Sequence, residues 1–318
     1  MFENTIDVPV YLITGFLESG KTSFLKFTIS QDYFQIDGTT LLLLCEEGEE
    51  EYDEAELRRC HTVVETLSEP EDLNYQTLRA LQRKHRPERV IIEFNSFWSV
   101  SALQEMRMPR GWGIVQDIVL ADAETFQVYL NNMKSLFVEM VRPADMVLFN
   151  RCEEGQPLAN FRRSIKVVNP ACDVQFMDKK RRPMDIFSDT VPFDLDKEII
   201  EIEDVDYGIF FVDMRDHPDR YEGKKVRFKG QVLKSREAGA DFFVPARSAM
   251  TCCADDIQYI GYLCKSKDAP RLPEGKWVEV TARVDWKFVP MAQEEQPVLQ
   301  AITVKETAAP DPELVYFN

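Results

Sequence analysis

The 318-residue sequence lacks any hydrophobic run that approaches the roughly 18 residues needed to cross a bilayer as a helix. Its first seven residues are acidic and lack the basic start of a secretion signal. The seven cysteines are spread along the chain without the pattern of a disulfide scaffold, so we expect reduced thiols. Together these absences predict a cytoplasmic protein that is not inserted in a membrane.

Positive charge is also scarce, because 38 Lys and Arg stand against 55 Asp and Glu, a formal net charge of −17. Such a surface repels phosphate backbones, so nucleic acid is not expected as a partner. A nucleotide would have to be held by local groups and a cation. The length is sufficient for two domains with a sizeable core.

Against this background, residues 15–22 predict a phosphate-binding loop. Their sequence, Gly-Phe-Leu-Glu-Ser-Gly-Lys-Thr, fits GxxxxGK followed by Ser or Thr. The apolar run at 8–14 indicates a buried strand and residues 23–27 open a helix, which is the context that the motif requires. Gly15 and Gly20 let the chain wrap so that backbone N–H groups point at phosphate oxygens.

The end of the loop supplies two functional side chains. Lys21 is expected to reach the β- and γ-phosphates, and the Thr22 hydroxyl to bind Mg²⁺. The start of the following helix adds a partial positive charge. We therefore predict a nucleoside triphosphate and Mg²⁺ as ligands.

The first half of the chain alternates between buried-strand and helix patterns. Strands are predicted at 39–45, 62–65, 89–94, 114–121, 146–149 and 165–168, and helices at 72–85 and 124–141. Continuous apolar strands that alternate with helices predict an α/β fold with a mostly parallel sheet covered on both faces. The loop after the first strand lies where such a sheet binds its ligand.

Near residue 180 the pattern changes. A basic run and a mixed, Pro-containing stretch predict a linker over 181–205, between a nucleotide-binding domain at 1–180 and a second domain at 206–318. In the second domain, strands are predicted at 209–214, 225–234, 241–244, 257–264, 277–288 and 298–304. Strands of this number and length favour a small all-β domain, such as an OB-like barrel.

The motifs of the first half resemble those of the CobW-like P-loop GTPases, a group within the SIMIBI class that includes the YjiA-type proteins. The matches, in order along the chain, are residues 13–22 with "TGFLGxGKTT", 45–53 with "NEFGExGID", 91–96 with "IETTG", 122–123 with "DA", 144–153 with "ADxxxxNKxD" and 168–171 with "lNPxA". Glu18 stands at a glycine of the first motif, and Ser23 at its last threonine.

This resemblance implies a Mg²⁺-dependent enzyme that binds and hydrolyses GTP. The implied phosphate-binding residues are Gly15, Glu18, Ser19, Gly20, Lys21, Thr22 and Ser23. Glu93 would hold the Mg²⁺ shell or orient the attacking water; alternatively it is a solvated strand end. Glu46, Glu49 and Asp53 would bind a hard cation or sense the γ-phosphate.

Base recognition is implied for three residues of the "ADxxxxNKxD" match. Asn150 would hydrogen-bond the purine, and the stem of Arg151 would lie over its face. Glu153 takes the place of the aspartate that binds the guanine N1 and N2 hydrogens, and is one methylene longer. Guanine is therefore the expected base, with an ATPase as the alternative.

A departure from the family concerns transition metals. The family's CxCC motif has no counterpart, because residues 66–72 contain no cysteine. We expect any tight Zn²⁺ site in the second domain, at Cys252, Cys253 and Cys264, since thiolates favour Zn²⁺. Two alternatives stay open: a site rebuilt around Cys45 and Cys60, and cysteines that are core residues.

The stretch around Cys252 and Cys253 resembles the "CCxADA" signature of YcgQ-like bacterial proteins, which implies a membrane permease as a partner. The first-half resemblance implies instead a nucleotide switch in metal homeostasis or cofactor assembly, with a metalloprotein client. The alternative is a nucleotide-dependent regulatory module for a permease with little turnover. The oligomeric state stays open.

Overall fold

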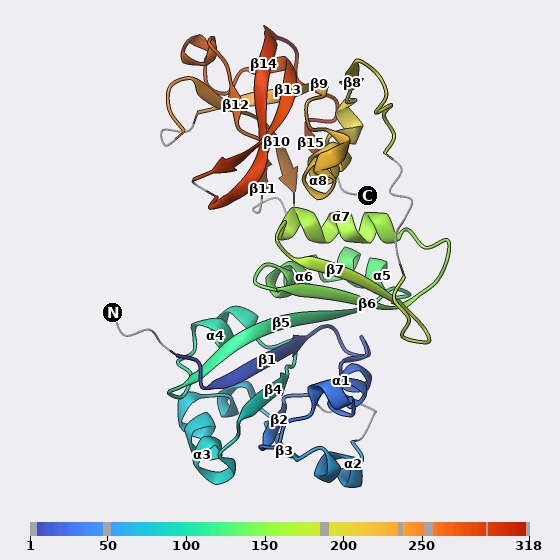
Figure 1. The fold of residues 1–318 in the computed structure, drawn as a ribbon, viewed down its shortest axis with the longest axis vertical. Helices are drawn as coiled ribbons and strands as arrows, with labels where there is room; N and C mark the ends of the chain where they lie inside the picture. Colours follow the sequence, from blue (N-terminus) through green and yellow to red (C-terminus); the bar gives the residue numbers. More distant parts are fainter. Residues whose placement is uncertain are drawn as a thin grey trace. The chain divides into compact units, whose positions relative to one another are not determined.

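The computed structural model of the protein describes residues 5–46, 52–184, 191–234, 238–250, 257–290 and 292–315, apart from the side chain of Met250. The chain divides into two compact units (Figure 1). The first comprises Met1–Leu158 and Val168–Ile186, and the second comprises Ala159–Val167 and Phe187–Asn318.

The first unit is built on a seven-stranded sheet with the order β3-β2-β4-β1-β5-β6-β7. Every pairing in it is parallel, which confirms the predicted α/β fold. The strands are β1 (Val8–Thr14), β2 (Thr40–Leu44), β3 (Thr62–Thr66), β4 (Arg89–Glu93), β5 (Trp112–Asp122), β6 (Met146–Cys152) and β7 (Asp173–Asp178).

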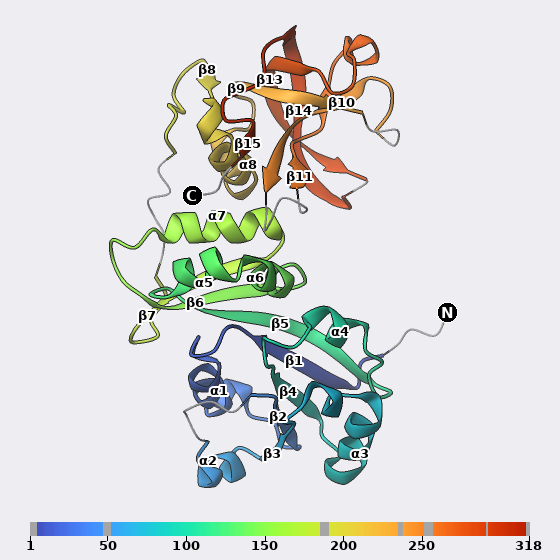
Figure 2. The same ribbon diagram turned by 180° about the vertical axis from the view of Figure 1, so that it is seen from behind.

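Helices cover both faces of this sheet (Figures 1 and 2). Alternation along β6 shows the two sides: Leu148 joins the core under α1, whereas Phe149 packs edge-on against Phe126 of α5. The helices are α1 (Lys21–Ile29), α2 (Glu54–Arg59), α3 (Tyr75–His85), α4 (Val100–Glu105), α5 (Phe126–Asn132) and α6 (Lys134–Val141), with 3₁₀ turns η1 (Asp32–Phe34) and η2 (Pro70–Asp72). Most of α7 (Leu158–Val168) belongs to the second unit.

The structure corrects one predicted strand and divides one predicted helix. Residues 165–168 are the last turn of α7, because the buried Leu158, Phe161 and Ile165 recur at helical spacing. The strand that follows is β7. The single helix predicted over 124–141 divides into α5 and α6 at Met133, whose φ of −134° is not helical.

The second unit is mostly β, as predicted. Its sheet has the order β11-β10-β12-β14-β13-β9-β8, and an added pairing of β10 with β9 closes five of these strands into a ring. The strands are β8 (Ile199–Glu201), β9 (Lys225–Leu233), β10 (Phe242–Met250), β11 (Ile257–Ile260), β12 (Cys264–Lys265), β13 (Trp277–Val289), β14 (Glu294–Glu306) and β15 (Leu314–Val315).

A helix replaces the first strand predicted here. Residues 209–214 lie in α8 (Tyr207–Asp216), where Tyr207, Phe210 and Met214 are buried at helical spacing. Short 3₁₀ turns complete the unit: η3 (Asp204–Asp206), η4 (Pro218–Arg220) and η5 (Ala269–Arg271). The stretch expected as a linker contains β8, which pairs with β9.

Across the described residues, no helix combines the length and the apolar character needed to span a membrane.

A buried carboxyl in β5 generates a prediction about pH. The Asp117 side chain is 3% exposed, and its Oδ1 has no hydrogen-bond partner among the described residues. Burial, together with nearby Asp145, raises the pKa of Asp117 to about 7. Since the unfolded chain ionises at lower pH, this group makes the fold less stable as pH rises from about 4 towards 7 and above.

Asp117→Asn is therefore expected to raise the free energy of unfolding at pH 8 by at least about 1 kcal/mol, because each pKa unit corresponds to about 1.4 kcal/mol. The gain should vanish near pH 3, where the carboxyl is mostly neutral in both states. Urea unfolding between pH 3 and 8 measures it, with exposed Asp173→Asn as the control. A gain that is independent of pH would contradict the assignment.

Candidate functional site

The loop between β1 and α1 has a backbone that depends on two glycines. Gly15 and Gly20 have φ values of 136° and 90°. A Cβ added to Gly15 would lie 2.3 Å from the Leu120 carbonyl oxygen, and one on Gly20 would lie 2.7 Å from Nδ2 of Asn150. The loop thus packs directly against the ends of β5 and β6, which leaves no room for side chains at these two positions.

Glu18 is a strained exception in this loop. Its φ is 61°, in the left-handed region, and its side chain is exposed. Glutamate at this φ costs roughly 1–2 kcal/mol relative to a right-handed conformation. The motif that the sequence resembles has glycine here, so the structure gives a physical reason for that glycine.

Lys21 forms the first part of the polar site. Its ammonium donates to the carbonyl oxygens of Gly15 (2.8 Å) and Phe16 (3.1 Å) and forms an ion pair with Oε2 of Glu46 at 2.7 Å. The Lys21 and Glu46 side chains are only 4% and 11% exposed. The structure thus brings together two of the predicted residues in a buried, charge-assisted contact.

Glu93, at the end of β4, forms the second part. Its two carboxylate oxygens each accept a hydrogen bond of 2.6 Å, from the Thr22 hydroxyl and from the Tyr52 hydroxyl. Burial raises the pKa of Glu93, and these two hydrogen bonds act in the opposite direction. Glu93 is therefore a fixed, buried carboxylate beside the start of α1, and not a solvated strand end.

Sequence reasoning missed two residues of this polar site. Tyr52 follows an acidic run, and only its contact with Glu93 reveals it. The Ser96 hydroxyl accepts a hydrogen bond from the Gly15 N–H at 3.0 Å and donates to the Gly15 carbonyl at 2.5 Å. Its place at the end of the "IETTG" match was the available signal, because that motif lies beside the phosphate loop.

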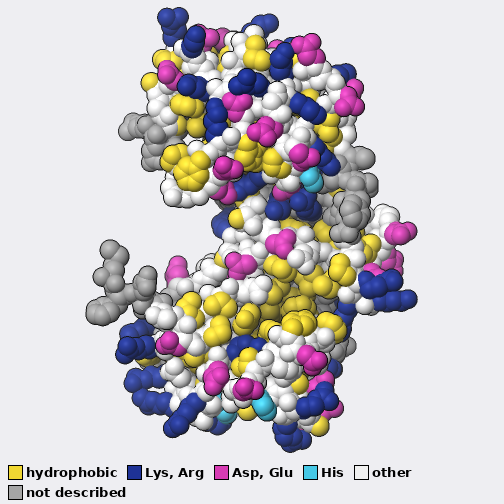
Figure 3. All heavy atoms as spheres, viewed as in Figure 1, with side chains coloured by type: hydrophobic (Ala, Val, Ile, Leu, Met, Phe, Trp, Pro, Cys, Tyr) yellow, Lys and Arg dark blue, Asp and Glu magenta, His cyan; other side chains and the backbone are white. Residues whose placement is uncertain are grey.

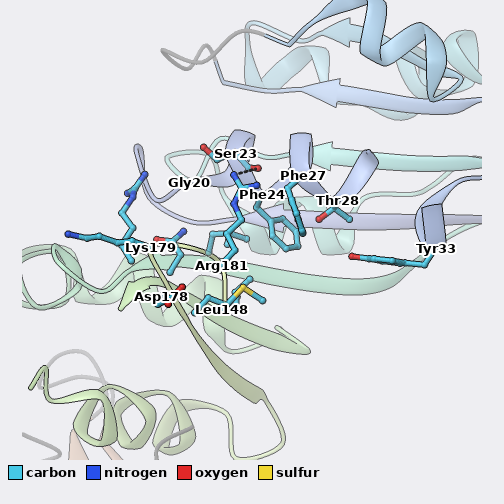
Figure 4. A pocket seen from close by; sticks show the side chains of 14 residues that line it. Gly20, Ser23, Phe24, Phe27, Thr28, Tyr33, Leu148, Asp178, Lys179 and Arg181 are labelled. Carbon is cyan, nitrogen blue, oxygen red and sulfur yellow. Dashed lines mark hydrogen bonds between the residues drawn. The ribbon is translucent and has the colours of Figure 1, made fainter. Parts of the chain in front are cut away.

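A cavity of about 220 Å³ opens beside the loop, between α1 and the ends of β6 and β7 (Figure 4). Apolar side chains gather on this part of the surface of the first unit (Figure 3). The cavity is lined by Gly20, Ser23, Phe24, Phe27, Thr28, Tyr33, Leu120, Leu148, Asn150, Arg151, Met177, Asp178, Lys179 and Arg181. A flat, largely apolar group with polar edges would fit such a lining.

Asn150 and Arg151 tie this cavity to the phosphate loop. The Asn150 amide donates to the Ser19 carbonyl at 2.6 Å, and its Oδ1 has no partner among the described residues. Arg151, at a φ of 53°, donates to the Glu18 carbonyl at 3.0 Å and to Asp122 at 2.6 Å. The ends of β5 and β6 are thus connected to the loop by hydrogen bonds.

Glu153 lies apart from the cavity lining. Its carboxylate is 56% exposed and pairs with Lys179 at 2.7 Å, while Lys179 also pairs with Glu124 at 2.6 Å. These two carboxylates raise the pKa of Lys179, so the ammonium stays charged. The Glu153 carboxylate, which was expected to bind the base, is thus engaged by Lys179.

The remaining predicted metal ligands do not gather in one place. Asp53 caps α2 by accepting from the backbone N–H groups of Ala55 and Glu56. Cys264 lies in the core of the second unit, fully buried, where burial raises the pKa of its thiol to about 12. Glu49, Cys252 and Cys253 lie outside the described residues.

The alternative thiols near the nucleotide site are also buried. Burial, and to a lesser extent Glu93, raises the pKa of Cys45 to about 12. Cys60 is buried in the core beneath α1. Within the part of the chain that the structure describes, no group of three or more His, Cys, Asp or Glu side chains is arranged to hold a metal ion.

Comparison with known families gives two matches. The model of the CobW/HypB/UreG nucleotide-binding domain matches residues 9–175, more than half of the chain. The model of the DUF1980 C-terminal domain matches residues 184–317, which hold most of the second unit. A search of the curated proteins gives no match.

The first unit is also similar to solved structures at low identity. Hydrogenase maturation factor HypB from Archaeoglobus fulgidus has 18% identity and a TM-score of 0.40, with 55% of this chain and 83% of that one covered. Zn(II)-bound YjiA GTPase from E. coli has 19% identity and a TM-score of 0.38, with coverage of 56% and 59%. HypB from Helicobacter pylori in complex with nickel has 14% identity and a TM-score of 0.36, with coverage of 55% and 80%.

The left-handed Glu18 gives a stability prediction. Glu18→Gly is expected to raise the free energy of unfolding by up to about 1 kcal/mol, because the strain removed exceeds the added backbone entropy of glycine. Glu18→Ala, which keeps the Cβ, should bring little gain. Denaturant unfolding followed by circular dichroism compares the two variants, and an equal gain in both would show that the charge of Glu18, not its φ, is responsible.

Proposed function

This chain belongs to the family of CobW/HypB/UreG nucleotide-binding domains, and on that premise we propose that it binds GTP with Mg²⁺ and hydrolyses it. The phosphates would lie in the loop between β1 and α1. The purine would lie in the cavity beside Asn150 and Arg151. ATP is the alternative nucleotide, because Glu153, the residue expected to bind guanine, forms an ion pair with Lys179.

The loop fits a phosphate group in its geometry and in its unsatisfied polar atoms. The Oγ atom of Ser19 is buried and has no partner among the described residues, so a phosphate oxygen would satisfy it. The bent loop and the start of α1 direct backbone N–H groups inward. Lys21 lies in the same loop, and its ammonium would exchange the Glu46 carboxylate for phosphate oxygens.

The residues around Glu93 fit a hard cation. The Thr22 hydroxyl and the carboxylates of Glu93 and Glu46 are oxygen groups of the kind that Mg²⁺ prefers. When bound, Mg²⁺ would neutralise charge on the β- and γ-phosphates. Thr22 would hold it through a lone pair of the hydroxyl oxygen, while the hydroxyl continues to donate its hydrogen bond to Glu93.

One observation carries the proposal more than any other: the Thr22 hydroxyl donates to Glu93 Oε1 at 2.6 Å. This contact joins the last residue of the phosphate loop to the end of β4, although 71 positions separate them. Tyr52 fixes the other carboxylate oxygen, so Glu93 is oriented before any ligand arrives. Glu93 and Glu46 are our candidates for orienting the water that attacks the γ-phosphate.

The cellular role that we propose is a nucleotide switch in metal homeostasis or cofactor assembly. The family membership and the ordered motif matches of the first half support this role. A transferred metal would have to involve residues such as Cys252 and Cys253, or a client protein. Metal analysis of protein purified without chelator, with and without GTP, tests the role, and no bound transition metal in either state would count against it.

The Lys21–Glu46 ion pair favours a second candidate, a nucleotide-responsive binding module with little turnover. The buried Glu46 carboxylate occupies the Lys21 ammonium that phosphate would bind. Glu46 must therefore move before the nucleotide can bind there. Such a module could control a permease partner through its second domain. Multiple-turnover assays with GTP and ATP distinguish the candidates, since a module would bind nucleotide and release little phosphate.

Loss of the loop lysine is expected to weaken GTP binding. Lys21→Ala removes a charged donor, and such hydrogen bonds contribute about 1.5–3 kcal/mol, which corresponds to roughly a tenfold to hundredfold loss of affinity. Lys84→Ala, which removes an exposed charge paired with Glu65, should leave affinity unchanged. Calorimetric titration with GTP and Mg²⁺ measures both. If Lys21→Ala binds GTP as well as the unaltered chain does, the phosphate site lies elsewhere.

Removal of the competing carboxylate should have the opposite effect on nucleotide entry. In Glu46→Gln no ion pair with Lys21 has to be broken before phosphate can bind the ammonium. GDP should therefore associate several times faster. Stopped-flow fluorescence with a labelled GDP measures the rate, and exposed Glu54→Gln is the matched control. Slower association would show that Glu46 assists entry instead of opposing it.

A further inference from the structure

The turn that follows β7 is held in one conformation by a dense set of hydrogen bonds. The Asp178 N–H donates to the Arg182 carbonyl at 3.0 Å, and the Arg181 N–H donates to the Asp178 carbonyl at 2.9 Å. Asp178 Oδ1 also accepts from the backbone N–H groups of Lys180 and Arg182. Arg181 adopts a left-handed φ of 60° at the tip. Its side chain therefore leaves the turn in a fixed direction.

That direction is across the cavity beside the phosphate loop (Figure 4). One NH2 group of Arg181 donates to the Ser23 carbonyl in α1 at 3.2 Å, and the guanidinium carbon lies 4.8 Å from the centre of the Phe27 ring. These are its contacts within the described residues, so the other N–H donors of this planar fork are available to a ligand.

Cationic side chains outnumber carboxylates in the cavity lining. Arg151, Lys179 and Arg181 line the cavity, and Asp178 is the one carboxylate among the lining residues. Asp178 is already satisfied by the turn and by the Arg182 side chain, with Nε at 2.7 Å from Oδ2. Arg151 and Lys179 are engaged by ion pairs with Asp122, Glu124 and Glu153. Arg181 is therefore the charged donor of this lining with no carboxylate partner among the described residues, and Asn150 Oδ1 is an acceptor without a partner among them.

The donors of the Arg181 guanidinium can distinguish the purines by their acceptor edges. Guanine presents two acceptors, O6 and N7, whereas adenine presents N7 beside an amino donor. Arginine pairs with the O6 and N7 edge of guanine through two hydrogen bonds, and an adenine amino group at the same place would face another donor. The carboxylate of Glu153, which would read the opposite edge through N1 and N2, pairs with Lys179 instead.

We propose that Arg181 is the residue that sets base specificity, and that it selects guanine through O6 and N7. This inference rests on the proposed nucleotide-binding function and adds to it the edge of the base that is read. It replaces the predicted selection by Glu153. The β7 turn, not the strand end that carries Asn150, then decides which nucleotide the chain prefers.

Inosine triphosphate tests which edge is read, because it keeps O6, N7 and the N1 hydrogen of GTP and lacks only the 2-amino group. If Arg181 reads the base, the unaltered chain should bind inosine triphosphate within about threefold of GTP. ATP should bind about tenfold or more weakly, the usual discrimination of one bidentate arginine contact. Equilibrium titrations with the three triphosphates and Mg²⁺ give the three affinities.

Variants of the turn assign the effect to one side chain. Arg181→Ala should lower the affinities for GTP and inosine triphosphate to the level of ATP and leave ATP nearly unchanged. Lys180→Ala, which removes an exposed charge from the same turn and does not alter the cavity lining, should keep the preference. Because both positions are exposed, neither variant is expected to disturb folding.

Other results would overturn the proposal. A loss of about tenfold for inosine triphosphate relative to GTP, abolished by Glu153→Gln and unaffected by Arg181→Ala, would assign base reading to Glu153. Equal affinities for GTP and ATP in the unaltered chain would show that Arg181 does not discriminate. If no triphosphate binds, the proposed nucleotide function itself fails. That result can be told apart from base reading by Glu153 and from equal affinities for GTP and ATP, because both of those require binding.

Discussion

The close approach of the Gly15 backbone to strand β5 is the constraint on which the site depends. A single added carbon would lie 2.3 Å from the Leu120 carbonyl oxygen, so the chain can turn here only without a side chain. The turn presents the Gly15 amide and carbonyl to Ser96 and brings Gly20 against Asn150. Lys21 then begins α1, and its ammonium donates to the carbonyl oxygens of Gly15 and Phe16 in the loop. A larger residue at Gly15 would displace all of these contacts together.

The parallel sheet supplies the rest of the site at one edge. Strands β4, β1, β5, β6 and β7 are neighbours in this order. All but β1 contribute a polar residue at or near their carboxyl ends, which are Glu93, Asp122, Asn150 and Asp178. Glu93, Asp122 and Asn150 hydrogen-bond to the phosphate loop or to a residue that does, and Asp178 orders the turn that carries Arg181. The site is thus largely assembled by the fold, which is the condition for precise ligand positioning.

The sequence predicted the parts of the site that local spacing determines. Lys21 and Thr22 follow from the loop motif, and Glu93 from its place at the end of an apolar strand. Tyr52 and Arg181 could not be predicted, because an acidic run and a basic run both suggest solvated surface until tertiary contacts are known. In the fold, the parallel sheet was predicted, whereas 209–214 favoured a strand by composition and became helical through burial of one face of α8.

The central claim is that a guanine nucleotide occupies the loop and the cavity beside it. Hydrogen exchange of the full chain with and without GDP and Mg²⁺, resolved by peptide mass spectrometry, tests it most directly. Slower exchange is expected in residues 15–23, 93–96, 150–151 and 178–182, with little change in β9 to β15. Unchanged exchange at residues 15–23, or protection confined to the second unit, would contradict it.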